Sequence, residues 1–251
     1  VSGDAPPVQG PNGHFAALRQ GVRMADHVIY LSEYERAFLN SIGARPKQWS
    51  LIPNGIDANI IAKGVARDFI NTFGIDRFVL CVGRIEPRKN QAMMALALRD
   101  LDIPFVCIGH VGDAAYFELV KKWSGPNFVH IDRIDERALL AGAYKAASCF
   151  ILTSWAEGAP LAALEAAASG VPLVLSTMSS EREYFGDYAK YCHPCDIEGM
   201  RDAVDQALSE TLGSRVARGE WACARFDIAD HTDRTLQAYD LVRALDRHGV
   251  D

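Results

Sequence analysis

Three cationic side chains gather in the segment GRIEPRKNQ, which spans residues 83–91. Arg84, Arg88 and Lys89 follow an apolar run of strand length and precede an apolar stretch with helical periodicity. An arginine guanidinium binds phosphate as a two-pronged fork, and a lysine ammonium binds it as a point charge. The segment therefore predicts a diphosphate site. A solvated basic loop before a helix is the alternative that this segment alone leaves open.

Two carboxylates, Glu157 and Glu165, stand eight positions apart in TSWAEGAPLAALEAAASG. Retaining glycoside hydrolases hold their carboxyl groups about 5–5.5 Å apart, and inverting ones about 6.5–9.5 Å. Eight positions along a helix give a rise of roughly 12 Å and a residual rotation of about 80°. If Pro160 is the first residue of a helix, Glu157 lies on the loop before it. The pair is therefore better placed to hold different parts of one long ligand than to flank one bond.

Glu165 lies within LAALEAAASG, which otherwise has the composition of a buried helix. A carboxylate in apolar surroundings requires a partner, because burying an unpaired charge is costly. This position therefore favours a functional role for Glu165.

Signatures of other chemistry are absent or incomplete. The sequence has no Walker A motif, and GHVGD does not match G-x-G-x-x-G. Asp100 and Asp102 form a D-x-D, but they precede a predicted strand and fall at the sheet edge opposite the ligands. Cys192 and Cys195 form a CxxC without the second pair that a zinc site needs, and we interpret them as coincidental cysteines in a loop. We expect no metal and no other cofactor.

The elements that must position these residues alternate between strand and helix. Apolar runs of strand length are FVLCVG (78–83), PFVCIG (104–109), NFVHI (127–131), CFILTS (149–154) and PLVLS (172–176). Strands covered on both faces are apolar throughout, and the helical stretches between them predict an α/β fold. We expect a doubly wound, Rossmann-like parallel sheet with flanking helices. Such sheets bind ligands beyond the carboxyl ends of their strands, which is where Arg84, Arg133 and Glu157 fall.

The length and composition of the chain limit its number of domains and exclude several classes of protein. With 251 residues, the chain has room for one large domain, or for one domain and part of another. A formal charge of −6 leaves no basic footprint, so we expect no nucleic-acid partner. No apolar run approaches the roughly 18 residues that span a bilayer. The cysteines give no sign of an oxidising compartment, so a cytoplasmic protein is expected.

Several segments together resemble the group 1 family of retaining GT-B glycosyltransferases, also called family 4. The resemblance runs from about residue 14 to residue 245. ADHVIYLSEYER (25–36) is similar to the segment that closes the family's N-terminal domain, and PNGID (53–57) to its interdomain turn. GRIEPRKNQ and the paired-Glu segment match two further motifs. The stretch EREYFGDYAKYCHPCD (181–196) resembles a fifth, through Glu183, Ala189, Pro194 and Asp196.

The resemblance implies a reaction and a role for each site residue. A sugar would pass from a UDP- or GDP-sugar to a glycan or lipid-linked glycan acceptor in polysaccharide biosynthesis, with retention of configuration. Arg84 and Lys89 would contact the donor diphosphate. Glu157 would contact the donor sugar, and Glu165 the ribose hydroxyls. Arg84, Lys89 and Glu157 are thus the catalytic candidates.

Further donor-binding residues follow from the same motifs. Gly83 is the first residue of GRIEPRKNQ. The backbone amides of Gly158, Ala159 and Leu161 would lie against the sugar and phosphate. Pro160 stands among them and has no N–H to donate. A separate inference from topology concerns Arg133 and Ile134, which follow the strand NFVHI and are predicted to border the base.

The expected domains follow the same resemblance. Residues 1–49 would be a linker (1–13) and the closing elements of an otherwise absent N-terminal GT-B domain. Residues 50–225 would form the nucleotide-sugar-binding domain, and 226–251 a C-terminal helix packing back toward the N-terminal domain. The absent domain would supply the acceptor site and any peripheral association with the inner face of a membrane. The 251-residue chain alone is therefore expected to be inactive.

Two alternatives to a glycosyltransferase remain. One is a catalytically inactive nucleotide-sugar-binding module. The other is a non-hydrolysing sugar-nucleotide epimerase of the same fold, which is disfavoured because such enzymes lack this pair of glutamates.

Overall fold

The computed structural model describes residues 11–248, which divide into two compact units. Unit 1 contains the residues up to Pro53 and those from Thr232 onward, and unit 2 contains Asn54–His231. Most of the predicted linker, residues 1–10, lies outside the described residues. Its last three residues belong to a helix instead, and Pro11 begins that helix, a position that tolerates proline because the first N–H groups of a helix have no partner within it.

Unit 1 contains two short helices and two short strands, together with most of the last helix. Its elements are α1 (Pro11–Met24), β1 (Val28–Tyr30), α2 (Glu33–Ser41), β2 (Trp49–Leu51) and α12 (Ile228–His248), whose first residues belong to unit 2. The strands β1 and β2 pair in parallel. Ser32 caps α2 by accepting a hydrogen bond from the Glu35 amide at 3.0 Å. The assignment of unit 1 to the end of a partner domain stays a prediction.

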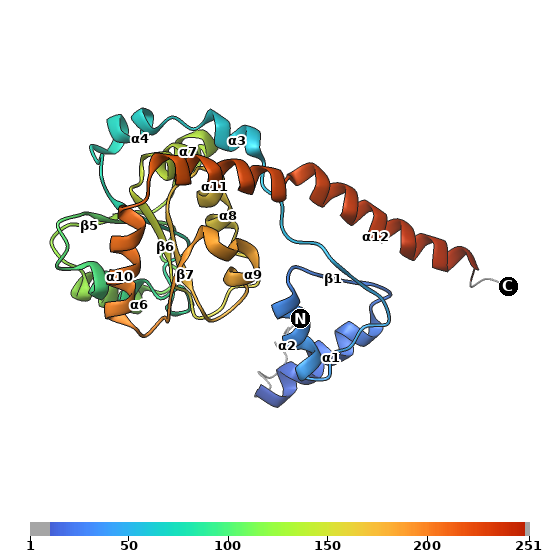
Figure 1. Ribbon diagram of the computed structural model, residues 1–251. Helices are drawn as coiled ribbons and strands as arrows, with labels where there is room; N and C mark the ends of the chain where they lie inside the picture. Colours follow the sequence, from blue (N-terminus) through green and yellow to red (C-terminus); the bar gives the residue numbers. More distant parts are fainter. Residues whose placement is uncertain (1–10, 249–251) are drawn as a thin grey trace, which may run out of the picture. The chain divides into compact units, whose positions relative to one another are not determined.

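Unit 2 is built on a six-stranded, wholly parallel sheet (Figure 1). Its strands are β3 (Val79–Val82), β4 (Phe105–Ile108), β5 (Phe128–Ile131), β6 (Cys149–Leu152), β7 (Leu173–Ser176) and β8 (Lys190–Cys192). They lie in the order β5-β4-β3-β6-β7-β8, which is the strand order of a Rossmann fold. The predicted doubly wound α/β fold is therefore confirmed. The chain reverses direction across the sheet between β3 and β6, and this switch point is where such sheets bind ligands.

Helices cover both faces of the sheet. One layer contains helices that pack on one another, namely α5 (Gln91–Leu98), α6 (Ala114–Trp123) and α10 (Ile197–Leu208). The other contains α3 (Ala58–Lys63), α4 (Ala66–Phe73), α7 (Arg137–Ala146), α8 (Leu161–Ala168) and α11 (Leu212–Arg225). A short helix α9 (Glu181–Phe185) and a 3₁₀ turn η2 (Gly186–Tyr188) connect β7 to β8. Another 3₁₀ turn, η1 (Pro87–Lys89), precedes α5.

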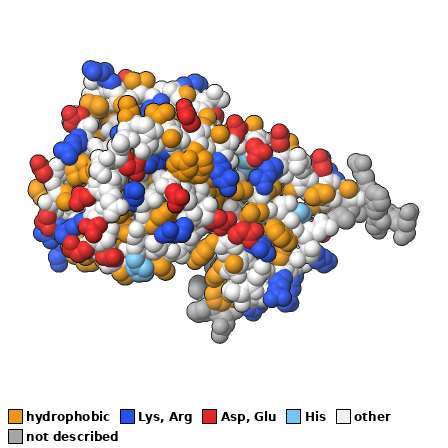
Figure 2. Space-filling view, in the orientation of Figure 1, with side chains coloured by type: hydrophobic (Ala, Val, Ile, Leu, Met, Phe, Trp, Pro, Cys, Tyr) orange, Lys and Arg blue, Asp and Glu red, His pale blue; other side chains and the backbone are white. Residues whose placement is uncertain are grey.

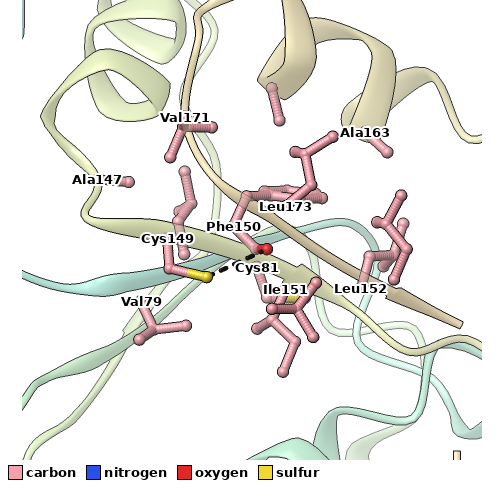
Figure 3. Close-up of a cluster of buried hydrophobic side chains, with 14 of the residues drawn as sticks. Val79, Cys81, Ala147, Cys149, Phe150, Ile151, Leu152, Ala163, Val171 and Leu173 are labelled. Carbon is pink, nitrogen blue, oxygen red and sulfur yellow. Dashed lines mark hydrogen bonds between the residues drawn. The ribbon is translucent and has the colours of Figure 1, made fainter. Parts of the chain in front are cut away.

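The core lies between these layers and consists mainly of strand residues. Every residue of β4, β6 and β7 is buried, as expected for strands covered on both faces. Figure 3 shows Cys81 and Cys149 among Phe150, Ile151 and Leu173. These cysteines pack as small apolar side chains, and burial raises the pKa of the Cys149 thiol above its usual value.

The sixth strand is a correction to the sequence analysis. The segment around Cys192 was expected to be a loop, but Lys190–Cys192 pairs in parallel with β7 and Cys192 is buried. Three residues are too few to show a hydrophobic period, so the sequence carried little signal for this strand.

Candidate functional site

The switch point brings together the loops that follow β3 and β6. The amide of Trp155 donates to the Arg88 carbonyl at 2.9 Å, and Arg88 Nη1 donates to the Ala156 carbonyl at 2.8 Å. The Lys89 and Glu157 side chains meet at the same place, 68 positions apart in the chain. Sequence patterns predicted both loops separately, and the fold joins them into one site.

Asn90 fixes the geometry of the loop after β3. It has a left-handed backbone (φ 64°), and its buried side-chain amide donates to the Thr153 carbonyl at 3.0 Å and the Pro194 carbonyl at 2.9 Å. The Asn90 side chain therefore connects the loop after β3 to the segments that directly follow β6 and β8. Asparagine and glycine are the residues that tolerate this backbone conformation best. The segment GRIEPRKNQ includes this asparagine, but its sequence did not reveal the cross-strand contacts.

Lys89 and Glu157 form a mostly buried ion pair at the centre of the site. Lys89 Nζ lies 2.7 Å from Glu157 Oε1, with side-chain exposures of only 14% and 7%. Arg88 Nη1 lies 3.5 Å from the other carboxylate oxygen. Removing one partner of such a pair leaves an uncompensated buried charge. The pair therefore presents a preformed cation to an anionic ligand that approaches it.

Arg84 and Arg88 lie on either side of Glu86. Arg84 Nη2 is 2.7 Å from one Glu86 oxygen, and Arg88 Nη2 is 2.8 Å from the other. Burial by itself would raise the pKa of Glu86, but the hydrogen bonds and charges of the two arginines outweigh it and lower that pKa. The Arg84 side chain is 61% exposed, so its guanidinium can turn toward a ligand without disturbing the core.

Two glycines allow the strand ends to approach closely. Gly83 (φ +153°) lies beneath the Lys89 side chain. A Cβ on Gly109 (φ +154°) would lie 2.2 Å from the Gly83 carbonyl oxygen, a distance that no structure tolerates. Glycine is thus required after both β3 and β4, because only its backbone adopts these positive φ values in the space available.

The helix after Glu157 begins one residue later than predicted. Pro160 is the N-cap of α8, and Leu161 is its first helical residue. The Leu161 amide donates to the Ala159 carbonyl at 3.0 Å, while the amides of Gly158 and Ala159 donate to no partner among residues 11–248. Unpaired N–H groups at the N-terminus of a helix favour anions. Two of the three predicted amides are therefore available in this structure.

Glu165 lies in a different environment from Glu157. It is on the second turn of α8, and its carboxylate accepts a hydrogen bond from Tyr144 Oη at 2.9 Å. It also lines a narrow cavity of ≈ 20 Å³ with Arg137 and Ile61. Burial raises the pKa of Glu165, although the Tyr144 hydrogen bond and the Arg137 charge oppose that rise. The two glutamates thus face different partners within the protein.

Arg133 and Ile134 lie on the same edge but farther from the switch point. They follow β5, the outermost strand on that side, with β4 between β5 and β3. The Arg133 side chain is 74% exposed and pairs with Asp135, and Ile134 packs on the core. The structure therefore does not bring them into contact with the Lys89–Glu157 pair.

Three residues of the site were missed by sequence reasoning. The Glu157 amide donates to Ser179 Oγ at 2.9 Å, and Ser180 Oγ donates to the Gly158 carbonyl at 3.0 Å. Ser179 in turn donates to Glu181 Oε2 at 2.9 Å. All three follow β7, and nothing in the serine-rich sequence TMSSE distinguished them from an ordinary turn.

The other candidate features are separate from this site. Asp100 precedes β4, at the opposite edge of the sheet, and pairs with Arg201 at 3.3 Å. Cys195 is exposed whereas Cys192 is buried. Within the described part of the chain, no three His, Cys, Asp or Glu side chains form a group that could hold a metal. The absence of a metal stays a prediction.

Two surface properties bear on partners. Over the face of unit 2 that Figure 2 shows, acidic and basic side chains are interspersed. The helices between residues 11 and 248 include none with the length and apolar character of a membrane span.

Comparison with known proteins gives consistent results. Residues 66–222, more than half of the chain, match the family model of Glycosyl transferases group 1. O-antigen chain mannosyltransferase B of Escherichia coli is 29% identical over 66% of this chain and 46% of its own length. A GDP-mannose-dependent phosphatidylinositol monomannoside mannosyltransferase of Mycolicibacterium smegmatis is 26% identical over 82% of this chain and 60% of its own.

Solved structures share the fold. Sucrose-phosphate synthase of Thermosynechococcus elongatus superposes with a TM-score of 0.82 at 21% identity, over 97% of this chain and 65% of its own. HepE of Anabaena in complex with UDP-glucose gives 0.79 at 17% identity, over 96% and 70%. The chain spans about half the length of the curated relatives it matches, 46% of the first and 44% of the second. The family match, together with the fold and the paired motifs at its switch point, shows that this chain belongs to the group 1 glycosyltransferases.

Proposed function

We propose that this chain is the donor-binding half of a retaining glycosyltransferase that uses a UDP- or GDP-sugar. The observation that carries the proposal is the buried Lys89–Glu157 pair at the switch point of a Rossmann-type sheet. Ligands bind at this point in open α/β sheets. A preformed cation, together with the unpaired amides of Gly158 and Ala159 in the loop that leads into α8, suits a diphosphate.

In the proposed reaction, the bond between the sugar anomeric carbon and the diphosphate oxygen breaks. A bond from an acceptor hydroxyl oxygen to that carbon forms on the same face, and the hydroxyl proton is released. The departing diphosphate gains negative charge as its bond breaks. Lys89 and Arg84 would stabilise that charge, together with the amides of Gly158 and Ala159.

The two glutamates would hold neutral parts of the donor. Glu157 would accept hydrogen bonds from sugar hydroxyls, with its carboxylate held by Lys89 and Arg88. Glu165 would accept from the ribose hydroxyls beside α3 and α7, where the narrow cavity lies. Arg133 and Ile134 remain candidates to border the base, and their distance from the switch point requires that the base extend across β4.

The acceptor side is proposed to lie in a further GT-B domain, because this chain covers about half of its relatives' length. A glycan or lipid-linked glycan is the proposed acceptor. The reaction is placed in the cytoplasm, where six unpaired cysteines are chemically stable.

Calorimetric titration of UDP-glucose and GDP-mannose into the 251-residue chain tests the proposal, with a transfer assay on the same sample. We expect one donor to bind while no sugar is transferred. The contacts to phosphate and ribose are retained, whereas the orientation of two reactants, worth up to roughly 7–11 kcal/mol, is not.

Lys121→Ala is a suitable control for charge, because Lys121 is an exposed cation on α6 that pairs with Glu118. It should bind the donor as the wild type does, and Lys89→Ala should bind it less tightly. Failure of both donors to bind would contradict the donor site. Efficient transfer by the chain alone would contradict the proposal that part of the catalytic site lies in a further domain. Donor binding without transfer in the two-domain protein would favour an inactive binding module.

A further inference from the structure

Glu181 is a buried carboxyl group that the proposed mechanism does not use. It begins α9, directly after the loop that follows β7, and its relative exposure is 0%. Its Oε2 accepts a hydrogen bond from Ser179, and its Oε1 has no hydrogen-bond partner in the described part of the chain. A buried carboxylate with one unsatisfied oxygen is costly. Such a group calls for an explanation beyond packing.

The position of Glu181 couples it to the donor site. Ser179 donates its hydroxyl proton to Glu181, and the same oxygen accepts the Glu157 amide proton at 2.9 Å. Glu181 therefore orients the hydroxyl that holds the backbone of Glu157. It is two hydrogen bonds away from the residue that pairs with Lys89.

The charges around Glu181 belong to the same site. Burial raises the pKa of Glu181 to about 7, against the opposing effect of its own amide and the Ser179 hydroxyl. The negative charge of Glu157 adds to that rise, and the positive charge of Lys89 opposes it. The Tyr191 hydroxyl on β8 donates to the main-chain carbonyl of Glu181 at 3.5 Å, and Tyr191 stays neutral because burial raises its own pKa well above its usual value. Within the part of the chain that the structure describes, Lys89 is thus the one cation that acts on both carboxylates.

We propose that Glu181 is a positioning residue that takes up a proton from solvent when a nucleotide-sugar diphosphate binds and draws Lys89 away from Glu157. This inference rests on the proposed donor site. The diphosphate adds negative charge and competes for the cation that offsets both carboxylates. Glu157 keeps its contact with Arg88, whereas Lys89 is the one cation among residues 11–248 that offsets the charge of Glu181. Protonation of Glu181 removes the repulsion while leaving one carboxyl oxygen to accept from Ser179.

The sign of the pH dependence follows from proton uptake. A ligand whose binding adds a proton binds more tightly at low pH, where the proton is already present. Donor affinity should therefore be nearly constant below about pH 7 and fall by up to about tenfold per pH unit above it.

The test is calorimetric titration of UDP-glucose and GDP-mannose into the 251-residue chain and into Glu181→Gln, from about pH 6 to pH 8.5. Nucleotide sugars are the right probes because each of their phosphates is esterified and has no ionisation in this range. Titrations in two phosphate-free buffers with different enthalpies of ionisation count the protons exchanged. The wild type should take up as much as one proton per donor above pH 7. Glu181→Gln keeps the acceptor for Ser179 but cannot titrate, so its affinity should change less than about threefold across the range.

Two further variants separate the charge of Glu181 from a general loosening of the loop. Glu198→Gln removes an exposed carboxylate on α10 and should behave as the wild type. Ser179→Ala leaves Glu181 without its hydroxyl donor, which disfavours the charged form, so the fall in affinity should begin at higher pH. Equal pH dependence in the wild type and in Glu181→Gln would overturn the inference while leaving the donor site intact. No binding by the wild type at any pH would overturn the donor site and this inference with it.

Discussion

Glu157 and Glu165 differ in every physical respect except their residue type. Glu157 lies on a loop, holds Lys89 at 2.7 Å and is 7% exposed at its side chain. Glu165 lies within α8 and is held by a neutral hydroxyl, that of Tyr144. Burial raises the pKa of Glu165. One carboxylate is thus part of an ion pair, and the other is a hydrogen-bond acceptor in an apolar wall.

The difference indicates a division of labour along one ligand. A carboxylate that already holds a cation suits the end of the donor where charge changes during the reaction. A carboxylate in apolar surroundings suits a neutral diol such as a ribose, because the hydrogen bonds it makes there are strong.

The largest effect is expected at the ion pair. Lys89→Ala, introduced into a protein that carries both GT-B domains, should lower turnover by roughly 10²–10³, the scale for removing one preorganised stabiliser of developing charge. Arg84→Ala should act in the same direction, since both cations lie in the loop after β3. Steady-state rates at saturating donor provide the measurement.

The matched control is again Lys121→Ala, whose turnover should equal that of the wild type. Circular dichroism should show folded protein for Arg84→Ala, because that side chain is largely exposed. Near-normal turnover in both site variants would contradict a role for Lys89 and Arg84 in stabilising the diphosphate. It would also contradict the proposal that Glu157 lies at the charged end of the donor.

The sequence predicted the α/β fold because its signals are local. Each of the strands β3 to β7 comes from a short apolar run bounded by turn residues. Parallel topology then places the carboxyl ends of these strands at one edge of the sheet. Lys89 and Glu157 were found for the same reason, since each belongs to a motif with its own spacing. Pro160 was misplaced by one residue, because the position of a helix boundary depends on backbone geometry rather than on composition.

Other parts of the site could not be predicted because their meaning arises from contacts across the chain. Asn90 bonds to carbonyls 63 and 104 positions away, and no local pattern records such distances. Glu181 follows two serines and begins the stretch 181–196, but it is not one of the residues through which that stretch resembles the family. Its burial is a property of the packed fold. The strand β8 was missed because it has only three residues.

An intermediate effect, on the affinity for a nucleoside diphosphate, is expected when Glu165 and Glu157 are each replaced by alanine. Glu165→Ala should weaken UDP or GDP binding by about 10–100-fold, the value of hydrogen bonds to a charged group. Glu157→Ala should not weaken that binding by more than about threefold, because its carboxylate is proposed to contact the sugar that these nucleotides lack. Calorimetry on the 251-residue chain measures both.

Tyr144→Phe distinguishes a ribose contact from a purely structural role for Glu165. It removes the hydroxyl that Glu165 accepts from, yet leaves the carboxylate in place, so nucleotide binding should stay within about threefold of the wild type. If Glu157→Ala weakened binding and Glu165→Ala did not, the two roles would be exchanged.

The smallest effect is expected from removing metal ions, and it tests what offsets the charge of Glu157. The comparison treats Lys89 and Arg88 as its counterions, with no divalent ion involved. The D-x-D at Asp100 and Asp102 lies away from the proposed donor site, because it precedes β4 at the opposite edge of the sheet, and Asp100 pairs with Arg201. Donor binding and transfer should therefore be unchanged by EDTA. Activity that is lost on chelation and restored by Mg²⁺ or Mn²⁺ would mean that a metal shares the diphosphate with Lys89. The charge of that metal would then have to be included in explaining how Glu157 differs from Glu165. Asp100 and Asp102 would again be candidates for binding the metal.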